Sequence, residues 1–169
     1  MNFFPVAVLS ACLLCACDSD STSELAEGLA EDTSDEIQEA FADNQQQFLI
    51  RNAAREGVTV TESGLQYEQL REGSGTPPGP NDVVTVHYVG TLTNGIEFDS
   101  SYARDEPATF PVSGVILGWQ EALQLMPVGS EYQLVIPPEL AYGDQGAGTQ
   151  IGPGAVLIFN VELLEINSQ

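Results

Sequence analysis

The spacing of apolar residues divides the chain into a helical part before Gly57 and a strand-rich part after it. Residues 34–56 predict one helix. Its apolar positions follow helical spacing: Ile37, Ala40, Phe41 and Phe48. Ser34 fits the N-cap, and Arg51 and Arg55 fall in the last turns, where cations favour the negative end of the helix dipole. Glycine is typical directly after a helix, so we expect the helix to end before Gly57.

Beyond Gly57 the pattern is that of short strands joined by turns. Residues 83–92 alternate apolar and polar side chains, and Asn94-Gly95 then predicts a hairpin that returns through residues 96–98. Three further strands are predicted, over residues 65–70, 132–136 and 157–163. One short helix is predicted over residues 118–126. This order predicts an α+β fold, in which one curled antiparallel sheet of about five strands wraps around one short helix and follows the N-terminal helix.

The first residues are typical of an exported, lipid-modified protein. Residues 3–14 form an apolar run that is too short to cross a bilayer as a helix. Leu14-Cys15-Ala16-Cys17 resembles a bacterial lipobox and is followed at once by polar residues. The sequence therefore predicts a lipoprotein signal peptide over 1–16 and lipidation of Cys17. Two alternatives remain open: lipidation of Cys12, and an ordinary cleaved signal peptide.

All three cysteines lie in this segment, so the mature chain keeps no cysteine pair for a disulfide and no thiolate set for zinc. We expect neither a metal nor a cofactor. From Asp18 to Asp43 the chain carries ten acidic residues and no basic one, a composition that resists collapse. The predicted organisation is an acidic flexible tether over 17–33, the helix over 34–56 and one globular domain over 57–169.

The charge of the whole chain is strongly negative. Its 25 acidic residues face four arginines and no lysine, which gives a formal net charge of −21. Such a surface repels phosphate backbones, so the composition excludes nucleic acid as a partner. Adaptation to a saline habitat and a general gain in solubility both explain this acidity, and both stay open.

Aromatic residues gather at the ends of the predicted strands and turns: Tyr88, Phe98, Trp119, Tyr142 and Phe159, with Asp99 directly after Phe98. Together they predict an apolar pocket with few polar groups, suited to a flat, weakly polar group such as a prolyl ring. His87 is the sole histidine. It lies on the opposite face of its strand from Tyr88, with no nucleophile at recognisable spacing, so we interpret it as structural.

Five segments occur in the order and spacing of FKBP-type peptidyl-prolyl cis-trans isomerases: 84–90 (VTVHYVG), 98–101 (FDSS), 115–119 (VILGW), 137–143 (PPELAYG) and 157–164 (LIFNVELL). The chain resembles this family over about two thirds of its length. Residues 57–58 and 63–67, together with the preceding helix, resemble its macrophage infectivity potentiator and FkpA-like branch, whose longer helical region dimerises. A homodimer therefore stays open.

The resemblance implies a role for each pocket residue. A substrate proline ring would lie over Trp119, within a set of surrounding walls: Tyr88, Phe98, Val115, Ile116 and Phe159. The main-chain N–H of Ile116 and the hydroxyl of Tyr142 would hold substrate carbonyls. Asp99 would accept a hydrogen bond from Tyr88 and pair with Arg104. The substrate-binding set implied by the resemblance is Arg104, Val115, Ile116 and Ile151.

Three positions depart from the best-known eukaryotic members: Ala108, Ala147 and Gln150. The last two lie in a glycine-rich stretch, 143–154, that fits a mobile flap beside Tyr142. Ala108 replaces an aromatic residue on the pocket rim and would leave the pocket wider. These changes therefore predict proline-containing polypeptides as ligands more strongly than macrolide inhibitors.

The sequence thus predicts a peptidyl-prolyl cis-trans isomerase that acts on unfolded polypeptides in the bacterial cell envelope. It would be lipid-anchored and face the periplasm, at either the inner or the outer membrane. Two rival functions use the same features differently. A tethered chaperone would grip unfolded segments without accelerating rotation, and an adhesive surface module would act through the acidic tether.

Overall fold

The computed structural model describes residues 22–167, and the first element of this part is a long helix. Helix α1 spans Thr22–Ala53. Of the described residues, 22–38 belong to one unit and 39–167 to a second, compact unit. Among the described residues, none of the helices combines the length and the apolar character that a membrane span requires.

The start of α1 differs from the prediction. The helix begins at Thr22, so Ser34 lies inside it and does not cap it. Residues 24–31 are rich in Ala, Leu and Glu, which favour helix strongly, and acidic side chains in the first turns suit the positive end of the dipole. Residues 22–33, predicted as part of a flexible tether, are therefore helical. The rest of that tether, the signal peptide and Cys17 lie outside the described residues.

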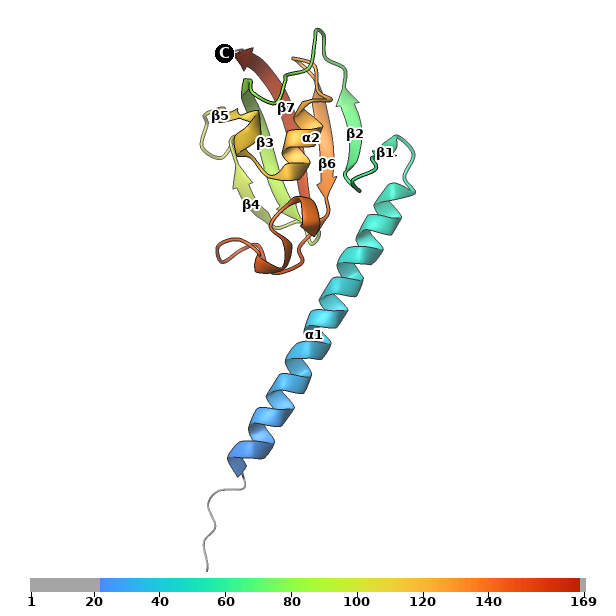
Figure 1. Ribbon diagram of the computed structural model, residues 1–169, viewed down its shortest axis with the longest axis vertical. Coiled ribbons are helices and arrows are strands. Elements are labelled where there is room, and N and C mark those ends of the chain that lie inside the picture. Colours follow the sequence, from blue (N-terminus) through green and yellow to red (C-terminus); the bar gives the residue numbers. More distant parts are fainter. Residues whose placement is uncertain (1–21, 168–169) are drawn as a thin grey trace, which may run out of the picture. The chain divides into compact units, whose positions relative to one another are not determined.

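The second unit is built on one antiparallel sheet (Figure 1). Its seven strands are β1 (Val58–Val60), β2 (Gln66–Arg71), β3 (Val83–Leu92), β4 (Glu97–Ser100), β5 (Ala108–Pro111), β6 (Glu131–Ile136) and β7 (Leu157–Asn167). They run in the order β1-β2-β6-β7-β3-β4, and β5 also pairs with β3. The α+β prediction is confirmed. The predicted number of about five strands is too low, because β1 and β5 are too short to show alternation.

Helix α2 (Leu117–Leu123) packs on the sheet, and Figure 1 shows it lying across β3, β7 and β6. Its buried side chains Trp119, Ala122 and Leu123 join the core together with the inward face of β3. A Cβ added at Gly118 would lie 2.5 Å from a methyl carbon of Ile136. The helix can therefore approach β6 this closely only because residue 118 has no side chain.

Within the second unit, two buried amide side chains hold the carboxyl-terminal end of α1 against its neighbours. Gln45 accepts a hydrogen bond from the Val156 N–H at 3.1 Å and donates one to the Thr93 hydroxyl at 3.2 Å. Asn52 donates to the side-chain carbonyl of Gln66 at 2.8 Å. Because buried polar groups are costly when unpaired, these bonds fix this end of the helix on the domain.

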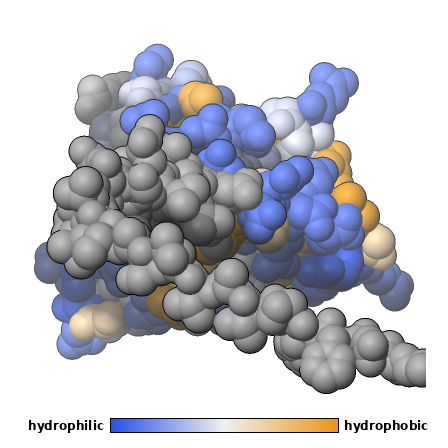
Figure 2. Space-filling view, turned by 90° about the horizontal axis from the view of Figure 1, so that it is seen from below, coloured by the Kyte–Doolittle hydropathy of each residue, from blue (hydrophilic) through white to orange (hydrophobic). Residues whose placement is uncertain are grey.

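Among the coloured residues of the face in Figure 2, hydrophilic ones predominate and apolar ones form only small groups. The apolar side chains are gathered instead in the core between α2 and the sheet. Three short helical turns complete the unit: η1 (Val112–Gly114) precedes α2, and η2 (Pro138–Leu140) and η3 (Gly143–Gln145) lie between β6 and β7.

Candidate functional site

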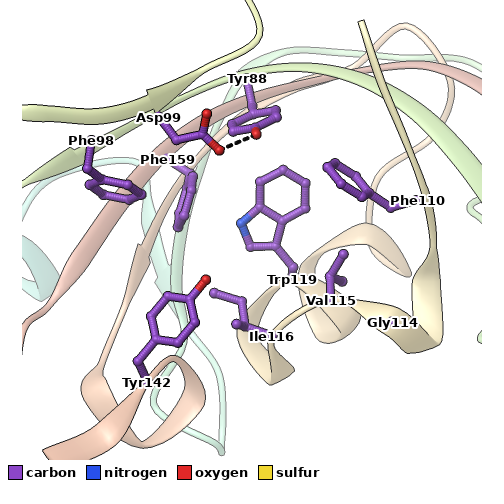
Figure 3. Close-up of a pocket in the computed structure, with 10 residues that line it drawn as sticks. All are labelled: Tyr88, Phe98, Asp99, Phe110, Gly114, Val115, Ile116, Trp119, Tyr142 and Phe159. Atoms are coloured by element: carbon purple, nitrogen blue, oxygen red, sulfur yellow. Dashed lines mark hydrogen bonds between the residues drawn. The ribbon is translucent and has the colours of Figure 1, made fainter. Parts of the chain in front are cut away.

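The described residues enclose a pocket of about 480 Å³ between α2 and the sheet (Figure 3). It is lined by Tyr88, Phe98, Asp99, Phe110, Gly114, Val115, Ile116, Trp119, Tyr142 and Phe159. Six of these ten residues are aromatic, and Asp99 carries the lining's one formal charge. A cavity of this size, with few polar groups, suits a small or partly inserted ligand whose recognised group is largely apolar.

Eight of the residues predicted for the site line this pocket, and two do not. Arg104 approaches from outside it and reaches Asp99 and Tyr88. Ile151 is buried and forms an isolated bridge with Ala147 in the flap. Neither side chain is among the residues that line the pocket, and their predicted part in substrate binding stays a prediction.

Phe110 and Gly114 line the pocket and were not predicted as site residues. Phe110 follows Ala108 by two residues on β5, so both side chains lie on one face of that strand. Ala108, predicted at the rim, instead packs against the core and does not line the pocket. The alternation of β5 is the signal that could have identified Phe110, whereas a glycine in a loop gives no comparable signal.

The indole of Trp119 is held at right angles by three aromatic neighbours. Its ring centroid lies 5.3 Å from that of Tyr88, 5.2 Å from that of Phe159 and 6.1 Å from that of Phe110, each pair close to perpendicular. Such edge-to-face pairs add to the free energy of apolar burial. In Figure 3 the indole nitrogen lies on the ring edge turned toward Phe159. The described residues offer this nitrogen no hydrogen-bond partner, so the floor of the pocket is held by packing contacts, the three aromatic pairs among them.

The polar group of the pocket is a three-residue network around Asp99. The Tyr88 hydroxyl donates to one carboxylate oxygen of Asp99, and Arg104 donates to the other. Arg104 also donates to the Tyr88 oxygen at 3.0 Å, and its guanidinium carbon lies 5.6 Å from the centre of the Tyr88 ring. The network fixes both the carboxylate and the tyrosine wall, as the resemblance implied.

Two pKa shifts follow from this geometry. Burial, and then the hydrogen bond to Asp99, raises the pKa of Tyr88, so the phenol stays protonated at neutral pH. Burial by itself would also raise the pKa of Asp99. The hydrogen bonds from Tyr88 and Arg104 outweigh it and lower that pKa below its ordinary value. Asp99 is therefore an ionised acceptor and unsuited to donate a proton.

The lowered pKa of Asp99 predicts a specific pH dependence of stability. A carboxyl group whose pKa falls on folding stabilises the fold above its unfolded pKa of about 3.9 and loses this contribution as the pH falls through the folded value. The difference in unfolding free energy between the wild type and Asp99→Asn should therefore be constant from pH 8 to pH 5 and shrink below about pH 4. Urea titrations at each pH measure it. A difference that stays constant down to pH 2 contradicts the assignment.

His87 lies on the outward face of β3, away from the pocket. Its Nδ1 atom is 2.9 Å from the Ser101 hydroxyl, and its ring stacks on Tyr102 at 4.4 Å. Ser101 is fully buried and also bonded to the main chain of Tyr88, so no substrate can reach this hydroxyl. The pair therefore has no access to substrate, in agreement with the structural interpretation of His87.

Tyr142 stands at the base of the glycine-rich loop and is directed into the pocket opposite Ile116 (Figure 3). The loop closes on itself through the Gly154 N–H, which donates to the Gly143 carbonyl at 3.0 Å. Among the described residues, nothing accepts the Ile116 N–H or bonds the Tyr142 hydroxyl. Both groups are therefore available to carbonyl oxygens of a ligand.

Comparison with protein families gives two matches that together span residues 18–164. The pattern of the FKBP-type peptidyl-prolyl cis-trans isomerase family matches residues 74–164. The pattern of the domain amino-terminal to FKBP-type peptidyl-prolyl isomerase matches residues 18–68. The match to residues 18–68 ends within β2, and the match to residues 74–164 begins in the loop that follows this strand.

Several curated proteins are similar to most of the chain. The FKBP-type 22 kDa peptidyl-prolyl cis-trans isomerase of Escherichia coli is 56% identical over 76% of this chain and 62% of its own length. The outer membrane protein MIP of Legionella longbeachae is 49% identical over 70% of this chain and 51% of its own length. This chain thus spans about half to three fifths of the relatives it matches.

Two crystal structures share the fold. FkpA from Escherichia coli superposes with a TM-score of 0.74 at 37% identity, over 90% of this chain and 74% of that one. A peptidyl-prolyl cis-trans isomerase from Pseudomonas syringae gives a TM-score of 0.72 at 38% identity, over 77% and 96% of the two chains.

Proposed function

Because the chain belongs to the FKBP-type peptidyl-prolyl cis-trans isomerase family, we propose that it accelerates rotation about X-Pro bonds in unfolded polypeptides. The observation that carries this proposal is the convergence of six aromatic side chains around one networked carboxylate in a pocket with room for a proline ring. Family membership makes this activity the expected one, and the geometry of the pocket gives a physical reason for it.

The proposed mechanism needs neither a nucleophile nor a covalent intermediate. A prolyl amide is planar by resonance, and its rotation meets a barrier of about 18–20 kcal/mol. Twisting the bond removes this resonance and makes the carbonyl less polar. An apolar pocket therefore destabilises the planar substrate more than the twisted state, which lowers the barrier between them.

Each pocket group has a role in this proposal. The proline ring would lie on Trp119, while the Ile116 N–H and the Tyr142 hydroxyl would each donate a hydrogen bond to a substrate carbonyl. Asp99, ionised and fixed by Tyr88 and Arg104, would place a negative charge beside the twisting carbonyl carbon. These contacts fix the ligand's orientation, so that binding energy contributes to rotation.

A refolding assay separates this function from its rival, a chaperone that holds unfolded segments. The full chain should accelerate a refolding step limited by proline isomerisation, and Asp99→Leu should lose this acceleration. Glu97→Leu is the matched control, because Glu97 is exposed two residues earlier on the same strand and does not line the pocket. An unaccelerated step with the wild type, together with suppressed aggregation of the reporter, would instead favour the chaperone.

The cellular context is proposed from sequence features beyond the described residues. We infer a signal peptide over 1–16, lipidation of Cys17 and a catalytic domain over 57–169 in the cell envelope, facing the periplasm. The lipobox-like segment supports this, and so does the name of the Legionella relative, an outer membrane protein. Labelled palmitate incorporated equally by Cys17→Ala and by the wild type would contradict lipidation of this cysteine.

Self-association through α1 is a further part of this proposal. Ile37 and Phe41 lie one helical turn apart on α1, and their side chains are exposed by 66% and 37%. Two such helices could bury these side chains against each other. Sedimentation equilibrium of the full chain, compared with an Ile37→Asp variant, tests for a dimer that this substitution dissociates.

A further inference from the structure

One edge of β3 has a gap in its pairing, opposite Tyr88. On that edge β5 pairs with β3 from Val83 to Val86, and β4 pairs with it from Val89 to Thr91. Between these two strands the chain leaves the sheet as a loop, residues 101–107. Main-chain groups of Tyr88 that point to this edge therefore need partners from outside a strand ladder.

Ser101 fills this gap with both its main chain and its side chain. Its N–H donates to the Tyr88 carbonyl at 3.0 Å, and its hydroxyl oxygen accepts from the Tyr88 N–H at 2.8 Å. The hydroxyl oxygen therefore stands where the carbonyl of a paired strand would otherwise lie. Because the side chain is fully buried, solvent does not compete with it for the Tyr88 main chain.

The Ser101 hydroxyl has a further hydrogen-bond partner, His87, on the outer face of the sheet. The oxygen lies 2.9 Å from His87 Nδ1 and 3.2 Å from the Tyr88 carbonyl, which already accepts from the Ser101 N–H. The hydroxyl oxygen thus accepts from the Tyr88 N–H, and the same hydroxyl is within hydrogen-bond distance of both the Tyr88 carbonyl and His87. The His87 ring is itself stacked on Tyr102.

The other end of Tyr88 belongs to the pocket. Its hydroxyl donates to Asp99, and its ring stands perpendicular to Trp119 at 5.3 Å. Asp99, Ser101 and Arg104 all come from one short segment, and each of them bonds to Tyr88. The main-chain position of Tyr88 thus decides whether its phenol reaches Asp99.

We propose that Ser101 is a positioning residue, whose buried hydroxyl holds the Tyr88 main chain at the gap between β4 and β5 and so keeps the Tyr88 phenol on Asp99. It touches no substrate and acts only through Tyr88. The proposal rests on the isomerase function proposed above for its effect on turnover. Its effect on the network around Asp99 can be measured without turnover.

The matched pair of variants is Ser101→Ala and Ser130→Ala, both in the full chain. Ser130 is also fully buried, but its hydroxyl has no hydrogen-bond partner among the described residues. Both substitutions remove one buried oxygen atom, and only the first removes a bond to Tyr88. We expect kcat/KM to fall about tenfold in Ser101→Ala, the order expected for one buried hydrogen bond, and to change less than twofold in Ser130→Ala.

A double-mutant cycle with Tyr88→Phe separates positioning from general destabilisation. If Ser101 acts through the phenol, then Ser101→Ala should lower kcat/KM far less in the Tyr88→Phe background than in the wild type. Independent losses that multiply in the double variant overturn the proposal. Equal kcat/KM in Ser101→Ala and the wild type overturns it as well.

A titration of the Asp99 carboxyl by carbon NMR distinguishes failure of this proposal from failure of the isomerase function. The pKa of Asp99 should rise in Ser101→Ala, because the Tyr88 hydrogen bond that lowers it is weakened, and should stay unchanged in Ser130→Ala. A wild type without isomerase activity refutes only the proposed function. An unchanged Asp99 titration in Ser101→Ala refutes the positioning role.

Discussion

Replacing Trp119 with alanine is expected to lower kcat/KM for a prolyl peptide by about a hundredfold or more, the loss of roughly 3 kcal/mol of transition-state stabilisation. The indole forms the pocket floor, is 4% exposed and contacts three aromatic rings edge to face. The same change removes a large buried side chain, so the free energy of unfolding should fall by about 3–5 kcal/mol. A peptide assay and a urea titration measure the two effects.

A second core variant separates the loss of the floor from the loss of stability. Met126 is fully buried in the same core but does not line the pocket. Met126→Ala should cost about 2–5 kcal/mol of stability and leave kcat/KM close to that of the wild type at temperatures where the protein stays folded. If Trp119→Ala and Met126→Ala lose activity equally, the indole has no special role in the reaction.

Gly90→Ala is expected to disturb two walls of the pocket at once. A Cβ at this position in the middle of β3 would lie 2.7 Å from a ring atom of Phe98 and 2.8 Å from one of Phe159. β3 is paired on both edges here, with Asp99 on one strand and Phe159 on the other, so the backbone cannot move aside. Overpacking of this kind costs about 1–3 kcal/mol, and we expect kcat/KM to fall about tenfold or more.

The control for this variant is Gly79→Ala. A Cβ at Gly79 would meet only the Asp82 side chain, at an ordinary contact distance of 3.6 Å, and the residue lies in a loop. Both substitutions replace a glycine with alanine and so restrict the backbone in the same way. The difference between their effects on stability and kcat/KM therefore measures the contacts with Phe98 and Phe159. Wild-type stability and kcat/KM in Gly90→Ala would show that Phe98 and Phe159 yield freely and are not held in place.

Most residues of the pocket can be predicted from the sequence, because local patterns determine which face of a strand or helix each side chain occupies. Alternation along residues 83–92 puts Tyr88 on the buried face of β3, and the same reasoning puts Phe159 on the buried face of β7. Neither residue alone indicates a pocket, since a buried aromatic side chain is ordinary in a core. Only the joint spacing of Phe98, Asp99 and Trp119 with these two distinguishes a site from a core.

What the sequence does not predict depends on contacts between distant segments. Phe110 belongs to β5, which has four residues and gains its place only by pairing with β3. Ser101 is a partner for His87 because β4 ends one residue before it, and no spacing rule anticipates that gap. The start of α1 differs from the prediction for another reason: the helix propensity of residues 24–31 outweighs the effect of their net charge.

The network around Asp99 also explains why a pocket with so few polar groups can be specific. Tyr88 and Arg104 each bond one carboxylate oxygen of Asp99, so the carboxylate is held in one orientation. The Ile116 N–H and the Tyr142 hydroxyl keep no protein partner among the described residues, and a site with unpaired donors favours ligands that carry carbonyl groups on either side of an apolar ring. An X-Pro segment of a polypeptide has this arrangement.

The central claim is that an apolar pocket floored by Trp119 accelerates rotation about X-Pro bonds. NMR exchange spectroscopy on a short Leu-Pro peptide, with catalytic amounts of the full chain, tests it directly, because it observes cis and trans forms without a protease. Uncatalysed exchange takes tens to hundreds of seconds. We predict exchange at least about tenfold faster with the wild type and no acceleration with Trp119→Ala. Exchange as slow with the wild type as in buffer, or undiminished in Trp119→Ala, contradicts the account.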